Sequence, residues 1–147
     1  MISRKPPFAE NELLFVYGTL LSGLSNHHHM QGASCLGPAT MQGALFDLGA
    51  YPAMLLSGHL SQPQGPVTGE LYKIEASHWA RLDALEEVDP ASIENSMYLR
   101  TTADVMWHTA NGPQALRAQV YVYNWSLAGR ARIAHGDFRR HVAHPKS

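Results

Sequence analysis

Three things are scarce in this chain: cysteine, unbalanced charge and long apolar runs. Cys35 is the only cysteine, so no disulfide can form within the chain, and such a count is typical of reducing compartments. The 11 basic and 12 acidic side chains leave a net charge of -1, which disfavours nucleic acid or an anionic membrane as a partner. No stretch reaches the ~20 apolar residues of a membrane helix, and the N-terminus lacks the apolar run of a signal peptide. We therefore expect a soluble, cytoplasmic protein with no nucleic-acid or membrane partner.

What is present has the size and composition of one ordinary domain. The 147 residues include 45% hydrophobic ones, enough for a single core. Residues 1–12 are polar and proline-bearing and predict a flexible N-terminal arm, with a single domain over residues 13–147. One helical pattern covers residues 75–90. Strand-like runs cover residues 13–17, 40–58 (with a turn at Gly49 and Pro52), 67–74, 97–109 and 117–125. The pattern predicts an α+β domain on a mixed or antiparallel sheet, with curling into a barrel as one form.

Glycine marks two places in this sheet. Asn111, Gly112 and Pro113 lie between the last two strand-like runs and predict a hairpin. Gly69 lies inside the run 67–74, where a glycine indicates a bulge or the close approach of another backbone. Both positions constrain how the strands meet.

Glu86 stands out because it falls on the apolar side of the helical pattern. At about 100° per residue around the helix axis and with Trp79 at 0°, Leu82 falls at about 300° and Glu86 at about 340°. Glu87 falls at about 80°, on the side that faces solvent. Burial raises the pKa of a carboxyl group, and a glutamate whose pKa approaches neutrality can take up and return protons. The alternative is structural: Glu86 pairs with an arginine such as Arg100, or its carboxylate reaches the edge of the apolar stripe.

The segment "YGTL" ends the first strand-like run. Gly18 allows a sharp turn and the close approach of a ligand to the main chain. Successive N–H groups in such a turn form a concave site for a carboxylate or an oxyanion, and Thr19 adds a hydroxyl donor. The alternative is an ordinary strand-to-loop turn with a conveniently placed glycine.

Several short segments occur in an order that points to one family. They are "LFVYGTL", Asn26, "LFDLGAYPA", "VTGELYKI", "LDALEEVD", "MYLR", "VYVYNW" and "HGDF". In order and spacing this set resembles the γ-glutamylcyclotransferase-like family, which includes γ-glutamylamine cyclotransferases and AIG2-like proteins. The resemblance covers residues 14–138. It implies a small mixed β-barrel with flanking helices and an active site at the mouth of the barrel.

The resemblance also implies roles for particular residues. The main chain at Tyr17, Gly18, Thr19 and Leu20 matches the loop whose amides hold the γ-glutamyl part of the substrate, and the pattern "LDxLE" places the catalytic glutamate at Glu86. The helical wheel selects the same glutamate independently. Tyr98 and Tyr123 match positions that line the cavity in the family, and the resemblance implies that they also bind the substrate.

The expected activity follows from these matches. It is release of 5-oxoproline from a γ-glutamyl amine or dipeptide, a small-molecule substrate, with no metal or organic cofactor. Many relatives carry glycine after the catalytic glutamate, whereas this chain has Glu87, which alters substrate preference or simply faces water. The alternative to an enzyme is a barrel that binds a γ-glutamyl or other small ligand without turning it over.

Other candidate residues have simpler explanations. Residues 27–29 are three consecutive histidines, whose side chains point in different directions, so a polar loop is favoured over a metal site. Glu70 is expected to be structural, either lining the barrel or pairing with a lysine or arginine. Arg139 belongs to a basic stretch with Arg130, Arg132 and Arg140 that is expected to form a solvated face.

Overall fold

The computed structural model describes residues 9–56, 65–89 and 91–143, and in this part of the chain six strands and four short helices follow one another. The strands are β1 (Leu13–Val16), β2 (Ser34–Asp47), β3 (Pro52–Leu56), β4 (Gly65–Lys73), β5 (Tyr98–Thr109) and β6 (Gly112–Tyr123). The α-helices are α1 (His78–Leu85) and α2 (Phe138–Ala143), and the 3-10 helices are η1 (Glu10–Glu12) and η2 (His27–Met30).

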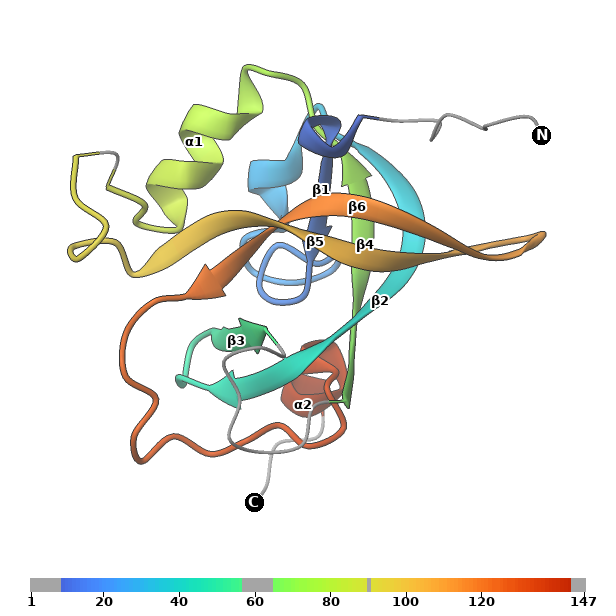
Figure 1. The fold of residues 1–147 in the computed structure, drawn as a ribbon. Helices are drawn as coiled ribbons and strands as arrows, with labels where there is room; N and C mark the ends of the chain where they lie inside the picture. The colour runs from blue at the N-terminus through green and yellow to red at the C-terminus, as the bar shows by residue number, and fades with distance from the viewer. Residues whose placement is uncertain (1–8, 57–64, 90, 144–147) are drawn as a thin grey trace.

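Five of the strands close into a mixed barrel. The order is β2-β4-β1-β6-β5, and β5 returns to β2 through the pairs Ala39–Trp107 and Thr40–Met106. The pairing of β1 with β6 is parallel, and the other pairings in the sheet are antiparallel. β3 lies outside the ring and extends the end of β2. The predicted α+β fold with a small mixed β-barrel and flanking helices is confirmed (Figure 1).

The short strand β1 is buried on both sides. Phe15 packs into the barrel core, whereas Leu14 and Val16 belong to a second cluster that includes Leu82 of α1. This double burial explains why residues 13–16 are continuously apolar. At Gly69 on the neighbouring strand, a Cβ would lie 2.1 Å from the carbonyl oxygen of Val16, so the expected close backbone approach is confirmed. The end of β1 is therefore held rigidly where the "YGTL" turn begins.

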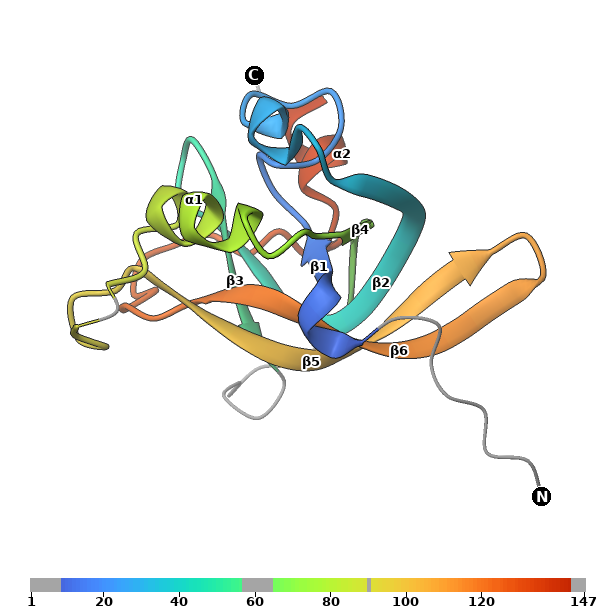
Figure 2. The same ribbon diagram turned by 90° about the horizontal axis from the view of Figure 1, so that it is seen from above.

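The last two strands form the expected hairpin, but it is longer than the sequence pattern suggested. β6 begins at Gly112, whose φ of +108° is easily reached only by glycine, and β5 and β6 pair along their whole length. Figures 1 and 2 show the tip of this hairpin extending away from the barrel, while its other end runs beneath α1. That end carries Tyr98 and Tyr123, which are paired across the two strands.

The helical pattern yields a shorter helix than expected. α1 covers His78–Leu85 and ends at Glu86, because Glu87 has a left-handed backbone with φ of +54°. Residues 1–8 of the predicted N-terminal arm lie outside the described residues. The end of that arm, Glu10–Glu12, forms η1, and the amide of Ile74 donates to the carbonyl of Glu12 at 2.6 Å.

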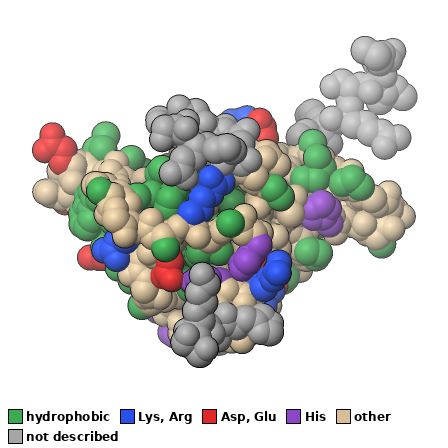
Figure 3. Space-filling model, turned by 90° about the horizontal axis from the view of Figure 1, so that it is seen from below, with side chains coloured by type: hydrophobic (Ala, Val, Ile, Leu, Met, Phe, Trp, Pro, Cys, Tyr) green, Lys and Arg blue, Asp and Glu red, His purple; other side chains and the backbone are tan. Residues whose placement is uncertain are grey.

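One face of the molecule carries charges of both signs. On the face seen in Figure 3, acidic, basic and histidine side chains lie scattered among hydrophobic ones. None of the helices in the described ranges is both long enough and apolar enough to cross a membrane.

Candidate active site

The turn that follows β1 presents unoccupied amide groups. The carbonyl of Gly18 accepts from the amide of Leu21 at 3.0 Å, which closes the turn, and Thr19 accepts through its carbonyl and its hydroxyl from Asn26, both at 2.9 Å. Within the described ranges, the amides of Gly18, Thr19 and Leu20 donate to no protein acceptor. A rigid turn with three free N–H groups is suited to bind an anion.

Gly18 is required in this turn by its neighbour. A Cβ at this position would lie 2.8 Å from two ring carbons of Pro52, at the start of β3. Pro52 is fixed in turn, because the Tyr98 hydroxyl donates to its carbonyl at 2.6 Å. On the other side of the turn, the Tyr17 hydroxyl donates to the carbonyl of Tyr121. The backbone of the turn thus forms one wall of a small cavity.

Glu86 lines the same cavity from the end of α1. Its position is set by the helix C-terminus: the amide of Val88 donates to the carbonyl of Asp83 at 2.9 Å, and the amide of Glu87 donates to the carbonyl of Ala84 at 3.1 Å. These two bonds form a Schellman motif with Glu86 as the C-cap residue. The motif directs the Glu86 side chain between the helix and the barrel.

The Glu86 carboxylate has no partner in the described part of the chain. No hydrogen bond or ion pair reaches it there. Every fully buried side-chain oxygen of the described residues has a partner, so the unpartnered oxygens of Glu86 are not fully buried. They open onto the cavity that Glu86 lines. Burial raises the pKa of Glu86 from 4.5 to about 7. An unpaired carboxyl group with a near-neutral pKa is suited to exchange protons with a ligand.

Arg100, the candidate partner of Glu86, is bound to another carboxylate. Its Nε lies 3.2 Å from Oδ1 of Asp83, and its guanidinium lies 4.2 Å from the centre of the Trp79 ring. The Tyr121 hydroxyl also donates to Asp83. The alternative in which Arg100 pairs with Glu86 is therefore wrong, because the ion pair of Arg100 is with Asp83.

Tyrosines form much of the remaining wall. Tyr51, Tyr98 and Tyr121 line the cavity together with Tyr17. Burial, with smaller contributions from neighbouring groups that include Glu86, raises the pKa of Tyr17, Tyr98 and Tyr121 well above the ordinary value of 10.0. Their hydroxyls therefore keep their protons at any physiological pH. Among the residues that line the cavity, the sequence did not identify Tyr51 and Tyr121, and it indicated Pro52 only as part of a turn.

Tyr123 does not line this cavity. Its ring contacts the ring of Tyr98 edge-on, with centroids 5.4 Å apart, and it borders a separate groove with Trp125. Tyr121 lies two residues earlier in the same strand and therefore on the same face, and this alternation was the signal that could have identified it.

Comparison with known proteins assigns the family. Residues 14–140 match the family model described as "Gamma-glutamyl cyclotransferase, AIG2-like". The chain belongs to the γ-glutamyl cyclotransferase, AIG2-like family. It is 37% identical over 126 residues to the γ-glutamylcyclotransferase family protein YtfP of Escherichia coli K12, a match that covers 85% of this chain and 94% of that protein.

Two further members of the family are similar to parts of the chain. One is γ-L-glutamyl-butirosin B γ-glutamyl cyclotransferase of Niallia circulans, 42% identical over 76 residues, which cover 50% of this chain and 45% of that protein. The other is the crystal structure of a mouse AIG2-like protein, with a TM-score of 0.63 and 25% identity over 80% of this chain and 81% of that chain.

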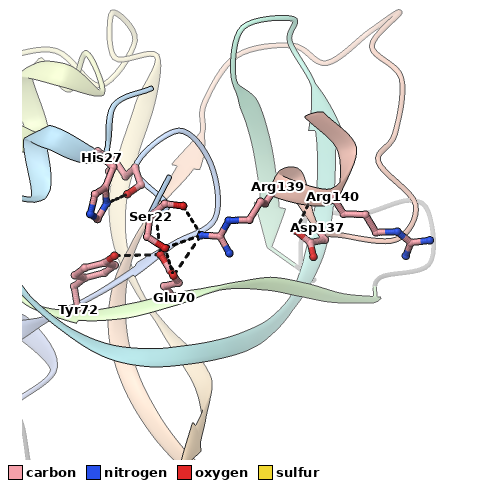
Figure 4. A network of polar contacts seen from close by, with 8 residues as sticks. Ser22, His27, Glu70, Tyr72, Asp137, Arg139 and Arg140 are labelled. Atoms are coloured by element: carbon pink, nitrogen blue, oxygen red, sulfur yellow. Dashed lines mark hydrogen bonds and ion pairs between the residues drawn. The ribbon is translucent and has the colours of Figure 1, made fainter. Parts of the chain in front are cut away.

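A polar network holds the end of the "YGTL" turn in this member of the family (Figure 4). Glu70 of β4 accepts from the amide of Ser22 at 2.9 Å and from its hydroxyl at 2.7 Å, and the Tyr72 hydroxyl donates to Glu70 at 3.1 Å. Arg139 of α2 donates to the carbonyl of Ser22 at 2.9 Å and lies 3.3 Å from the Glu70 carboxylate. The structural role of Glu70 is confirmed. Arg139 is exposed, as expected of a solvated face, but it is also bound to this network, whereas Arg140 points away from the network in Figure 4.

The consecutive histidines support the turn from the other side. They form η2, where His27 Nδ1 lies 2.9 Å from the carbonyl oxygen of Leu20, while the rings of His28 and His29 contact each other with centroids 4.1 Å apart. In residues 9–56, 65–89 and 91–143, no group of three or more His, Cys, Asp or Glu side chains is arranged to hold a metal ion.

Glu87 carries a backbone conformation that favours glycine, and this gives a stability prediction. Glu87→Gly is expected to raise the free energy of unfolding by about 1 kcal/mol. A left-handed residue with a Cβ costs roughly 1–2 kcal/mol, which glycine avoids. Part of this gain is offset because glycine loses more conformational entropy on folding. Urea denaturation measures the difference. The control is Ala84→Gly, an exposed position within α1, which is expected to lower the free energy of unfolding by up to about 1 kcal/mol. Destabilisation by both substitutions would contradict this account of the helix end.

Proposed function

We propose that this protein is a γ-glutamyl cyclotransferase that releases 5-oxoproline from γ-glutamyl amides. The observation that supports this most is the pairing of two features across one cavity: three amides without acceptors at Gly18–Leu20, and the unpaired carboxylate of Glu86. A γ-glutamyl group carries an α-carboxylate and an α-ammonium on one carbon, so it complements both features at once. The family membership and the similarity to the butirosin cyclotransferase support the same class of reaction.

The reaction is an intramolecular acyl transfer. The α-amine nitrogen attacks the γ-carbonyl carbon, a C–N bond closes the five-membered lactam, and the C–N bond of the γ-amide breaks. Because the nucleophile is tethered to the carbonyl, the enzyme has mainly to align the two groups and move protons. The α-ammonium loses two protons in all and the leaving nitrogen gains two. The products are therefore 5-oxoproline and the protonated leaving amine, and no water is consumed.

Each feature of the cavity takes one task in this scheme. The amides of Gly18, Thr19 and Leu20 hold the α-carboxylate, and this fixes the direction of the α-amine. Glu86 takes a proton from the α-ammonium and returns it to the leaving nitrogen, a task suited to a pKa of about 7. The tyrosine wall, including Tyr98, limits the water around the reacting atoms.

The experiment that tests the proposal is an end-point assay for 5-oxoproline. The purified protein is incubated with a panel of γ-glutamyl amines and γ-glutamyl dipeptides, and 5-oxoproline is quantified by mass spectrometry. Release from at least one compound is expected, at a rate that scales with the protein concentration. Binding of the same compounds in calorimetry without any release would instead support the ligand-binding alternative.

The network around Ser22 predicts a change in substrate affinity. Arg139→Met is expected to raise KM by about two- to fivefold with little change in kcat, since a partly exposed ion pair contributes about 1 kcal/mol or less. The reason is that the turn holds the α-carboxylate equally in the ground state and the transition state. Steady-state kinetics on the best substrate measure the change. Arg140→Met removes the same charge from α2 outside the network and is expected to leave both constants unchanged; an equal rise in KM for the two variants would point to net charge instead.

A further inference from the structure

A second cleft lies beside the catalytic cavity. Both are lined by Thr19, Tyr51, Glu86 and Tyr98, so the two spaces meet at the proposed catalytic carboxylate. The proposed chemistry requires such an arrangement, because the leaving amine must depart from the side of the γ-carbonyl opposite the enclosed glutamyl group. The second cleft adjoins the catalytic cavity along this shared wall.

The part of this cleft that is not shared has a distinct character. Asn26, Leu85, Glu87 and Met97 line it. Leu85 and Met97 offer apolar contact for a carbon chain, and Glu87 adds a second carboxylate next to Glu86. Of the described residues that line either cavity, none is lysine, arginine or histidine. A carboxylate on the leaving group would therefore meet two acidic side chains and no basic one.

Glu87 is held at this edge by its backbone. Its amide donates to the carbonyl of Ala84 at 3.1 Å, and its carbonyl accepts from the amide of Met97 at 3.1 Å. Arg100, a cation on the adjoining strand, is already paired with Asp83 at 3.2 Å. The Glu87 side chain is exposed, lines the cleft and has no hydrogen-bond or ion-pair partner among the described residues, so its charge faces whatever occupies the cleft.

We propose that this second cleft is the leaving-group site, and that Glu87 makes the enzyme prefer γ-glutamyl amides whose leaving amine carries a positive charge over those whose leaving amine carries a carboxylate. The inference rests on the proposed cyclotransferase function and adds the class of leaving group to it. The preferred substrates are γ-glutamyl derivatives of diamines or polyamines with a short apolar chain between the nitrogens. γ-Glutamyl amino acids are poor substrates because their carboxylate is repelled.

A matched series of three substrates tests the inference. The γ-glutamyl amides of 1,4-diaminobutane, butylamine and 4-aminobutyric acid share one chain length and differ in the charge at the far end. The expected order of kcat/KM is cationic, neutral, anionic, with about a tenfold ratio between the extremes at low ionic strength, as expected for charges a few ångströms apart near a protein surface. The ratio is expected to shrink in high salt.

Variants separate Glu87 from general charge effects. Glu87→Gln is expected to reduce the cationic-to-anionic ratio by about three- to tenfold. Glu94→Gln removes the same charge from an exposed position that lines neither cavity and is expected to leave the ratio unchanged. Equal turnover of the three amides, or a ratio that Glu87→Gln does not change, would overturn the assignment while leaving the cyclotransferase proposal intact. Absence of 5-oxoproline from all three amides and from the broader panel would overturn both.

Discussion

Glu86→Gln is expected to lower kcat/KM for 5-oxoproline release by about 10²- to 10⁴-fold, the contribution typical of general acid–base catalysis. Glutamine keeps the size and the hydrogen-bonding shape of the side chain but cannot accept the proton of the α-ammonium. Substrate binding is expected to change much less, because the α-carboxylate is held by the main chain at Gly18–Leu20. Steady-state kinetics with the best substrate, together with calorimetric binding of that substrate to the variant, measure the two effects separately.

The pH dependence of the parent enzyme provides an independent test of the same role. A base must be ionised to act, so kcat/KM is expected to rise with pH and to level off above about 7, the pKa to which burial raises Glu86. In Glu86→Gln this rise is expected to disappear from the residual activity. The control is Glu94→Gln, which is expected to keep the parental rate and profile. A parental rate in Glu86→Gln would show that another group transfers the proton.

The sequence was sufficient to identify the two halves of the candidate site separately. Glu86 is detectable because helical periodicity places it among apolar residues, and the turn is detectable because Gly18 follows a strand that is apolar throughout. Gly69 and the hairpin at Gly112 are likewise local signals, and the structure agrees with both. Each of these inferences depends on residues close together in the chain.

Features that depend on distant segments could not be predicted in the same way. The contact of Gly18 with Pro52 depends on how β3 extends β2, which no local pattern encodes. Arg139 reaches Ser22 across 117 residues of sequence, and its neighbours in the chain suggested only a basic surface. The helix end at Glu86 was missed for a different reason: periodicity continues past it, and a left-handed glutamate at position 87 is not a usual stop signal.

The second large effect concerns stability, and it has the opposite sign to the effect on activity. The pKa of Glu86 is raised in the folded state from 4.5 to about 7 by burial, so the folded protein holds a proton that the unfolded chain releases between these two values. Folding therefore becomes less favourable as pH rises through this window, and the loss is complete above about pH 7. At about 1.4 kcal/mol for each pH unit, the ionised side chain costs the folded state up to about 3 kcal/mol.

Glu86→Gln removes this cost, because glutamine is never ionised. The variant is expected to be more stable than the parent by up to about 3 kcal/mol at pH 8 and to show little difference at pH 4, where both side chains are neutral. Urea denaturation of the two proteins at several pH values measures the difference, and subtraction cancels the titration of all other groups. Glu94→Gln is expected to show no such trend, because Glu94 is exposed. A difference that is constant with pH would mean that burial does not raise the pKa of Glu86. The expected trend would show that the protein keeps the charge needed for proton transfer at the expense of stability.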